Sequence, residues 1–186
     1  MGKSTAGSLL AAQGIPVVDT DEIARAESQP RTEGFTEIVA AFGAGILSDE
    51  GTIDRRRLAG RVFSDPRERR RLEAILHPRI ERRWRRDVEL SKTSGCTLIA
   101  VLIPLLFERQ YDRSFGRIIA VACSRETQRS RLMERGWSDR EIEDRNAAQI
   151  PVPEKMQRAD FVVWTEGDLG SHGRQLDRIL GRFSPC

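Results

Sequence analysis

Long hydrophobic runs are absent from the sequence, since no stretch approaches the roughly 18 to 20 apolar residues that a membrane span needs. The first residues show no signal-peptide core, and no internal repeat or low-complexity linker interrupts the chain. Only eight prolines occur in 186 residues, and 39% of the residues are hydrophobic, unlike the composition of a disordered protein. We therefore expect one folded domain spanning residues 1–186, without a membrane segment.

Cysteine is also scarce, with three residues in the chain: Cys96, Cys123 and Cys186. Their odd number and the lack of CxxC spacing argue against a disulfide framework and against a zinc site. Unpaired thiols suit a reducing compartment, so the expected location is the cytoplasm.

A large excess of one charge is missing as well, because 31 Lys and Arg side chains are offset by 28 Asp and Glu side chains. The net charge of +3 excludes a polycation. It predicts no more than a weak general preference for phosphate-bearing partners.

Strands and helices are expected to alternate along the chain. Short apolar, β-branched runs predict strands at 15–19, 96–103, 117–123 and 159–164. Apolar spacing predicts helices at 4–13, 126–135 and 139–149, and a helical excursion between Ile23 and Leu90. Gly14 is expected to cap the first helix, and Ser138 with Glu141 offers a capping box for the helix at 139–149. This order implies right-handed crossovers and a parallel sheet with helices on both sides.

The segment Gly2-Lys3-Ser4-Thr5 has the residues that end a G-x-x-x-x-G-K-[ST] phosphate loop. In such a loop the glycine lets the backbone approach phosphate, the lysine reaches the β and γ phosphates, and the serine ligates magnesium. The helix that follows presents its N-terminal amides to the anion. Alone, the tetrapeptide is a weak signal, because a lysine and a serine also begin many ordinary helices.

Two carboxylates, Asp19 and Asp21, follow the first expected strand, where open α/β sheets place their ligands. One carboxylate there could accept the proton of an attacking hydroxyl, and either could help to hold magnesium through water. The structural alternative is that Asp21 caps a helix beginning at Glu22.

Beyond these two segments, the order of motifs resembles the dephospho-coenzyme A kinase family from Gly2 to about Leu180. The matching segments are GKST at 2–5, GIPVVDTDEIAR at 14–25, FSDP at 63–66, LEAILHPRI at 72–80, PLLFE at 104–108, ETQRSRLMER at 126–135, RNAAQ at 145–149 and KMQRAD at 155–160. Each is short, but their combination in the family order is specific.

The resemblance implies an α/β fold of the P-loop NTPase type, with a three-layer arrangement around a parallel sheet. It also implies three subregions within one kinase domain. They are a core made of residues 1–27, 95–123 and 150–186, a helical acceptor-binding region at 28–94, and a helical lid at 124–149.

The activity that the resemblance implies is transfer of a phosphoryl group from ATP, with Mg²⁺, to the 3′-hydroxyl of dephospho-coenzyme A, the last step of coenzyme A synthesis. Asp21 matches the family's proposed general base, and Gly2, Lys3, Ser4 and Thr5 match its nucleotide-binding loop, with Ser4 as the magnesium ligand. Arg131 and Arg135 match the lid helix, where guanidinium groups neutralise the transferring phosphoryl. Apart from the resemblance, arginines at this spacing are typical of a solvated helix face.

The acceptor side implied by the resemblance comprises Asp19, Arg25, His77, Leu105, Leu106, Phe107 and Glu108. His77 lies in the family's H-P motif, although a lone histidine at a helix end is also typical of a cap. Leu105, Leu106 and Phe107 would line the cleft, and Glu108 would pair with a nearby arginine. The same segment is equally consistent with a strand exit that packs into the core.

Arginines are dense between positions 79 and 86, where four of them are expected on one helical face opposite Ile80, Trp84 and Val88. No aromatic residues are interleaved with them and no nucleic-acid-binding module is recognisable. A solvated face is therefore the preferred interpretation, and the sequence argues against a nucleic-acid partner. The expected partners are small molecules, and the sequence gives no oligomeric state.

Three departures from the family pattern bear on activity. The family begins with an apolar strand and a glycine-rich stretch before GKST, and here Met1 stands where that stretch should continue. We expect the reading frame to begin upstream, with the first, central strand of the sheet missing from this chain. Genuine degeneration is the rival, and Arg31 in place of glycine and Trp164-Thr165 in place of a more polar pair fit it, although surface drift explains them equally well. The competing function is a catalytically impaired protein that binds nucleotide or nucleic acid.

Overall fold

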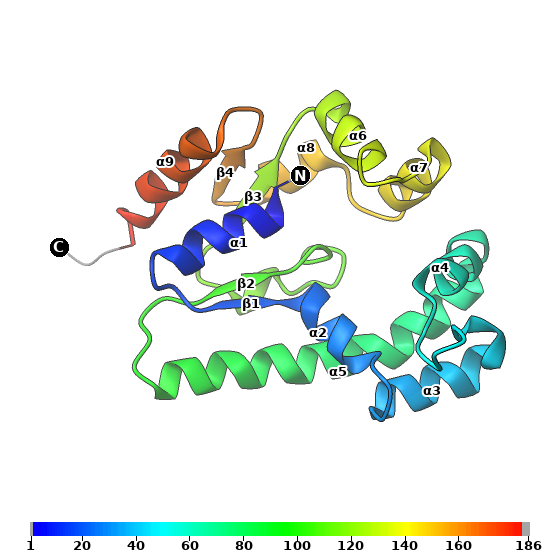
Figure 1. Ribbon diagram of the computed structural model, residues 1–186. Helices are drawn as coiled ribbons and strands as arrows, with labels where there is room; N and C mark the ends of the chain where they lie inside the picture. The colour runs from blue at the N-terminus through cyan, green and yellow to red at the C-terminus, as the bar shows by residue number, and fades with distance from the viewer. Residues whose placement is uncertain (1, 184–186) are drawn as a thin grey trace. The chain divides into compact units, whose positions relative to one another are not determined.

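The computed structural model describes residues 2–183, apart from the side chain of Phe63 (Figure 1). Contacts between residues divide the chain into two compact units. Unit 1 comprises the described parts of Met1–Val17 and Pro104–Cys186, and unit 2 comprises Val18–Ile103. Within the described residues, no helix is long and apolar enough to cross a membrane.

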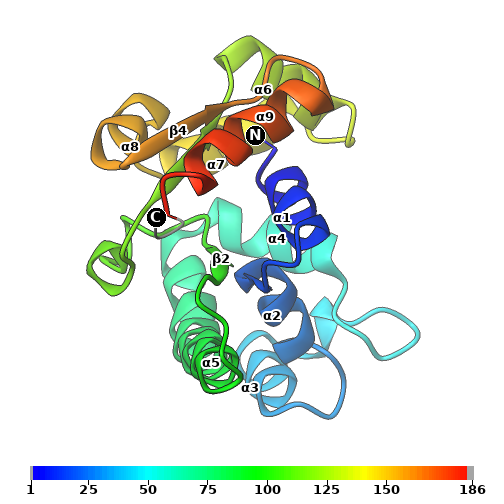
Figure 2. The same cartoon turned by 90° about the vertical axis from the view of Figure 1, so that its left-hand side faces the viewer.

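Unit 1 is built around two parallel strands, β3 (Ile119–Ala122) and β4 (Phe161–Trp164), which pair in register from Ile119 opposite Phe161. Its helices are α1 (Lys3–Ala12), α6 (Arg125–Met133), α7 (Asp139–Ala147), α8 (Val152–Arg158) and α9 (Leu169–Leu180), with a 3-10 turn, η2, at Asp112–Ser114. Helix α9 packs against both α1 and β4 (Figure 2). Its buried side chains Leu176 and Ile179 join Val163 and Ala122 of the strands in the core of this unit.

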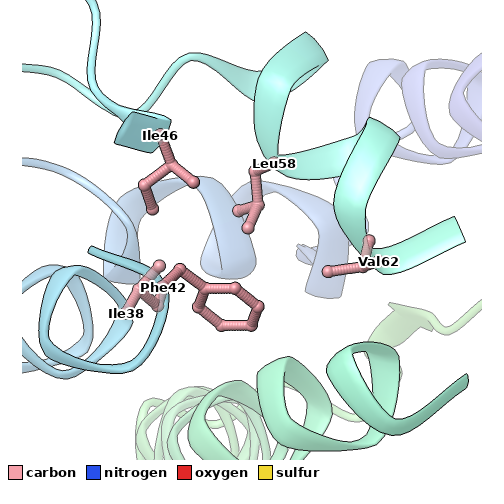
Figure 3. Packing of buried hydrophobic residues seen from close by; sticks show 5 residues of the cluster. All are labelled: Ile38, Phe42, Ile46, Leu58 and Val62. Carbon is pink, nitrogen blue, oxygen red and sulfur yellow. The ribbon is translucent and has the colours of Figure 1, made fainter. Parts of the chain in front are cut away.

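Unit 2 is mainly helical. It contains β1 (Val17–Asp19), which pairs with β2 (Ala100–Leu102), and the elements α2 (Thr20–Glu27), α3 (Glu33–Phe42), η1 (Ala44–Ile46), α4 (Arg55–Ser64) and α5 (Pro66–Thr93). Five buried side chains from α3, η1 and α4 form its core, and α5 packs against them (Figure 3). They are Ile38, Phe42, Ile46, Leu58 and Val62.

The predicted fold class is confirmed, because short strands alternate with helices and β3 and β4 run parallel. The strands are shorter than predicted: only residues 100–102 of the expected 96–103 strand are in β2. Its partner β1 has three residues, so the ladder can extend no further. The described strands form two two-stranded sheets, where the sequence predicts one sheet.

Two of the predicted caps are confirmed. Gly14 has φ of 79°, the left-handed conformation that glycine adopts without strain. Ser138 and Glu141 form the predicted capping box at the start of α7, with the Ser138 amide donating to Glu141 at 2.9 Å. Both helix ends are therefore set by local sequence.

Two structural alternatives are wrong in their details. Asp21 does not cap α2, because the cap is Asp19, whose Oδ1 accepts the Asp21 amide at 2.8 Å. His77 does not end a helix either, because α5 continues through Pro78 to Thr93. Proline removes one hydrogen bond from the helix. The packing of Ile75 and Leu76 on the core of unit 2 holds the part of α5 just before Pro78.

The predicted solvated face of arginines needs one correction, which concerns Arg79. Its side chain is only 14% exposed and donates to Glu37 at 2.6 Å and to the Ile75 carbonyl at 2.8 Å. Trp84 is buried as predicted. Arg79 thus joins α5 to α3, a role that helical spacing alone does not show.

Candidate active site

The N-terminus of α1 provides the structural basis of the predicted phosphate loop. Gly2 precedes the helix with φ of 75°, and it has no side chain that could cap the amides of the first turn. Lys3 is half-buried, whereas Ser4 and Thr5 are exposed. A helix end of this kind binds anions, because its amides and its dipole both favour negative charge.

A side chain at position 2 would be crowded by two buried neighbours. A Cβ at this position would lie 3.1 Å from Thr165 Cγ2 and 3.4 Å from His172 Cε1. Thr165 and His172 are 4% and 5% exposed, so they cannot move aside into solvent. Glycine is required here both by the backbone conformation and by the approach of these two residues.

Arg131 on α6 binds the same residue that touches Gly2. Its guanidinium donates to Thr165 Oγ1 at 3.1 Å and to the Thr165 carbonyl at 2.6 Å. The predicted helix 126–135 is wrong at its end, because α6 stops at Met133 and Arg135 lies in the exposed turn beyond it. Gly136, with φ of 80°, follows in this turn. Arg131 and Arg135 are therefore on different elements.

Glu166 fixes the other end of α6. Its Oε1 accepts the Ser124 amide at 2.8 Å and the Thr127 hydroxyl at 3.0 Å, and its Oε2 accepts Trp164 Nε1 at 3.1 Å. Hydrogen bonds from Ser124, followed by that from Thr127, lower the pKa of Glu166 to about 2. The carboxylate is thus charged at neutral pH, and two consecutive residues, Thr165 and Glu166, hold both ends of α6.

His172 lies beside this cluster on α9. Burial, and to a smaller extent the charge of Arg131, lowers the pKa of His172 below its ordinary value of 6.5. The imidazole is therefore neutral at neutral pH. Its Nε2 is buried and has no hydrogen-bond partner among residues 2–183.

The predicted carboxylate pair lies in unit 2, where β1 meets α2. Thr20, between the two aspartates, donates to the Leu102 carbonyl at 2.8 Å and ties this corner to β2. Asp21 is exposed in the first turn of α2, and Arg25 is exposed in its last turn. His77 is half-buried on α5 of the same unit. Lys3 belongs to unit 1, so the shared site that the resemblance implies for Lys3 and Asp21 stays a prediction.

Glu108 binds a lysine and not an arginine, which corrects its predicted partner. Its Oε1 lies 2.8 Å from Lys155 Nζ and accepts the Ile150 amide at 2.9 Å, and the two side chains are 16% and 14% exposed. Phe107 is buried beneath the guanidinium of Arg158, at 4.3 Å, whereas Leu105 and Leu106 are half-buried. The segment 104–108 is therefore held by α8 and the residues just before it.

The candidate magnesium ligands named by the sequence carry oxygen donors. Within the described part of the chain, no three His, Cys, Asp or Glu side chains are grouped so that they could hold a metal ion. Mg²⁺ is commonly held by one or two protein oxygens together with substrate phosphates. The hydroxyl of Ser4 and the carboxylates of Asp19 and Asp21 are donors of the kind that Mg²⁺ prefers.

Comparison with known proteins identifies the family of the chain. A family model described as dephospho-CoA kinase matches residues 1–170. The chain belongs to this family. Curated dephospho-CoA kinases are similar to it along almost their whole length. That of Bdellovibrio bacteriovorus is 42% identical over 96% of this chain and 89% of its own, and that of Anaeromyxobacter dehalogenans is 43% identical over 96% and 85%.

Solved structures show the same fold. A crystal structure from Thermus thermophilus is 34% identical with a TM-score of 0.76, covering 99% of this chain and 93% of its own. The dephospho-CoA kinase from Campylobacter jejuni is 25% identical with a TM-score of 0.69, covering 98% and 92%. The family assignment, which the sequence motifs suggest, is confirmed.

In this dephospho-CoA kinase family member, sequence reasoning missed four residues around the site. Lys155 stands in the KMQRAD segment that carries the resemblance, so its motif could have drawn attention to it. Glu166 and His172 have no motif or spacing that points to them. The sequence singles out Thr165 only as part of a departure that degeneration and surface drift explain equally well, yet the residue is buried beside Gly2 and Arg131.

Proposed function

We propose that the protein transfers the γ-phosphoryl group of ATP to the 3′-hydroxyl of dephospho-coenzyme A, which gives ADP and coenzyme A in the last step of coenzyme A synthesis. The observation that carries the proposal is the N-terminus of α1, where the N-cap Gly2 has no capping side chain and adjoins the residue that binds Arg131, in a member of the dephospho-CoA kinase family. Such a helix end fits the phosphates of a nucleotide.

The proposed reaction divides charge and proton handling among a few residues. Lys3 neutralises the β and γ phosphates, and the amides of Gly2 and Thr5 lie at the helix end that faces them. Asp21 accepts the proton of the 3′-hydroxyl as its oxygen attacks the γ-phosphorus, and the bond from that phosphorus to the bridging oxygen of ADP breaks. Arg131, with Arg135 from the turn beyond α6, offsets negative charge on the transferring group. A Mg²⁺ ion held by Ser4 would neutralise the phosphates further.

The acceptor, dephospho-coenzyme A, is proposed to contact both polar and apolar side chains. Asp19, Arg25 and His77 are its polar neighbours, and Leu105, Leu106 and Phe107 are its apolar ones. Glu108 is already bound to Lys155 and the Ile150 amide, so we assign it the role of holding segment 104–108 in place. The free thiols of Cys96 and Cys123 support the proposal of a cytoplasmic, reducing environment.

A direct assay tests the reaction. The chain is incubated with ATP, Mg²⁺ and dephospho-coenzyme A, and ADP and coenzyme A are measured by chromatography and mass spectrometry. Asp21→Asn is expected to lower kcat by a factor of about 100 or more, because it removes a general base. Asp49→Asn changes an exposed aspartate outside the proposed site and serves as the matched control.

Each outcome has a defined meaning. An unchanged kcat in Asp21→Asn would remove Asp21 from the mechanism. Faster turnover of another alcohol than of dephospho-coenzyme A would replace the proposed acceptor. Nucleotide binding without turnover, or salt-sensitive RNA binding without ATP turnover, would favour the impaired binding protein instead.

A further inference from the structure

One buried polar group beside the proposed phosphate site has no assigned role, the imidazole of His172. The residue is 5% exposed, and its Nε2 has no hydrogen-bond partner among residues 2–183. Burying a polar nitrogen without a partner is unfavourable, because the nitrogen loses its hydrogen bonds to water. A core position of this kind would be filled more favourably by leucine, so the histidine calls for a reason other than packing.

The position of the ring suggests that reason. Its Cε1, which is bonded to Nε2, lies 3.4 Å from the point that a Cβ at Gly2 would occupy. Gly2 is the N-cap of the ten-residue helix α1, and it has no side chain that could cap the first-turn amides. The unpartnered nitrogen is therefore beside a helix end suited to an anion. The two observations are independent, since one concerns α9 and the other α1.

The neutral ring can donate one hydrogen bond to an anionic ligand. Burial, and to a smaller extent the charge of Arg131, which is bound to Thr165, lowers the pKa of His172. A neutral imidazole carries one N–H and one acceptor nitrogen. A bound anion would favour the tautomer of His172 whose N–H is on the nitrogen that faces the anion.

We propose that His172 is a binding residue of the phosphate site, and that its Nε2–H donates a hydrogen bond to a phosphate oxygen of the bound nucleotide. This inference rests on the proposed function, because it assumes that α1 receives a nucleotide. It adds α9 to the elements that contact the phosphates. It also accounts for the unpartnered nitrogen, which receives its acceptor only when the ligand binds.

Two substitutions separate the hydrogen bond from the packing. His172→Leu fills similar space without a polar atom, whereas His172→Gln keeps an N–H donor close to the position of Nε2. Calorimetric titration with ADP is expected to give an affinity about tenfold weaker for His172→Leu and within about threefold for His172→Gln. Adenosine, which lacks phosphate, should bind all three proteins equally. Thermal unfolding of His172→Leu should be no lower than that of the wild type, because the variant no longer buries an unpartnered nitrogen.

Nuclear magnetic resonance gives a direct readout, because the chain has only two histidines. The ¹⁵N resonance of His172 Nε2, assigned by its loss in His172→Leu, should shift when ADP is added. The proposal is overturned if this resonance does not respond, if both variants bind ADP as the wild type does, or if His172→Leu weakens adenosine as much as ADP. In those cases the proposed kinase function stands. Failure of the wild type to bind ADP or ATP at all would overturn that function as well.

Discussion

Replacing Lys155 by methionine should destabilise unit 1 strongly, because this residue neutralises a carboxylate that is mostly removed from water. Lys155 Nζ lies 2.8 Å from Glu108 Oε1, and it also donates to the Pro104 carbonyl at 3.1 Å and to Gln149 Oε1 at 3.0 Å. The two charged side chains are 14% and 16% exposed. Methionine keeps the apolar stem but leaves the Glu108 charge with the Ile150 amide as its hydrogen-bond donor.

Breaking a buried ion pair on one side costs about 3 to 5 kcal/mol, and we expect about 3 kcal/mol here because some exposure remains. Urea denaturation gives this value as the difference in the free energy of unfolding. In the double variant Glu108→Gln with Lys155→Met, a neutral amide replaces the carboxylate. The decrease in the free energy of unfolding should therefore be smaller than the sum of the decreases in the two single variants.

A lysine in a different setting provides the control. Lys92 Nζ is 2.6 Å from Glu89 Oε1, but the two side chains are 58% and 67% exposed. Lys92→Met should therefore change the free energy of unfolding by less than about 0.5 kcal/mol. The reasoning is refuted if Lys155→Met costs no more than Lys92→Met, or if the losses in the double variant simply add.

Three further predictions concern single elements. Glu166 has a pKa of about 2 in the folded protein against an ordinary 4.5, so its contribution to stability is present above pH 4.5 and is lost as pH falls through 2. Acid titration followed by circular dichroism should show that folded structure depends less steeply on pH in Glu166→Gln than in the wild type. Phe42 is 4% exposed in the core of unit 2, and Phe42→Ala should cost about 3 to 5 kcal/mol in urea denaturation, whereas a cost below about 1 kcal/mol would contradict the packing in Figure 3. Ser138→Ala removes the capping box of α7 and should cost about 1 kcal/mol by thermal unfolding, and Ser138→Asp should recover most of it.

Local chemistry made much of the fold predictable from the sequence. The glycine at position 14 and the pair Ser138 and Glu141 act within one turn of chain, so their roles follow from residue type and spacing. Arg31 is informative in the same way: it departs from the glycine that the resemblance leads us to expect there, and the structure gives φ of 74°. Glycine adopts this conformation without strain and arginine does not, so the family preference has a backbone cause.

The rest depended on contacts between residues that are distant in sequence. Arg131 and Thr165 are 34 positions apart, and Glu108 and the Ile150 amide are 42 apart. The chain has 31 Lys and Arg side chains. Neither the charge of Glu108 nor the apolar residues around it show that Lys155, among these, is the partner of Glu108. Helix α5 passes Pro78 for a similar reason, because packing in unit 2 outweighs a local preference that the sequence displays plainly.

The anchoring of α6 also constrains how its arginine can act in the proposed transfer. A lid arginine that had to leave Thr165 before meeting a phosphate would lose two hydrogen bonds, worth about 1 kcal/mol each. A guanidinium has five N–H donors, however, and Thr165 takes two of them. The remaining donors can meet a phosphate oxygen while the Thr165 contact persists. Because Thr165 also touches Gly2, this arrangement would keep Arg131 and the start of α1 in fixed register during the reaction, so Thr165→Val should weaken ADP binding while Thr165→Ser should not.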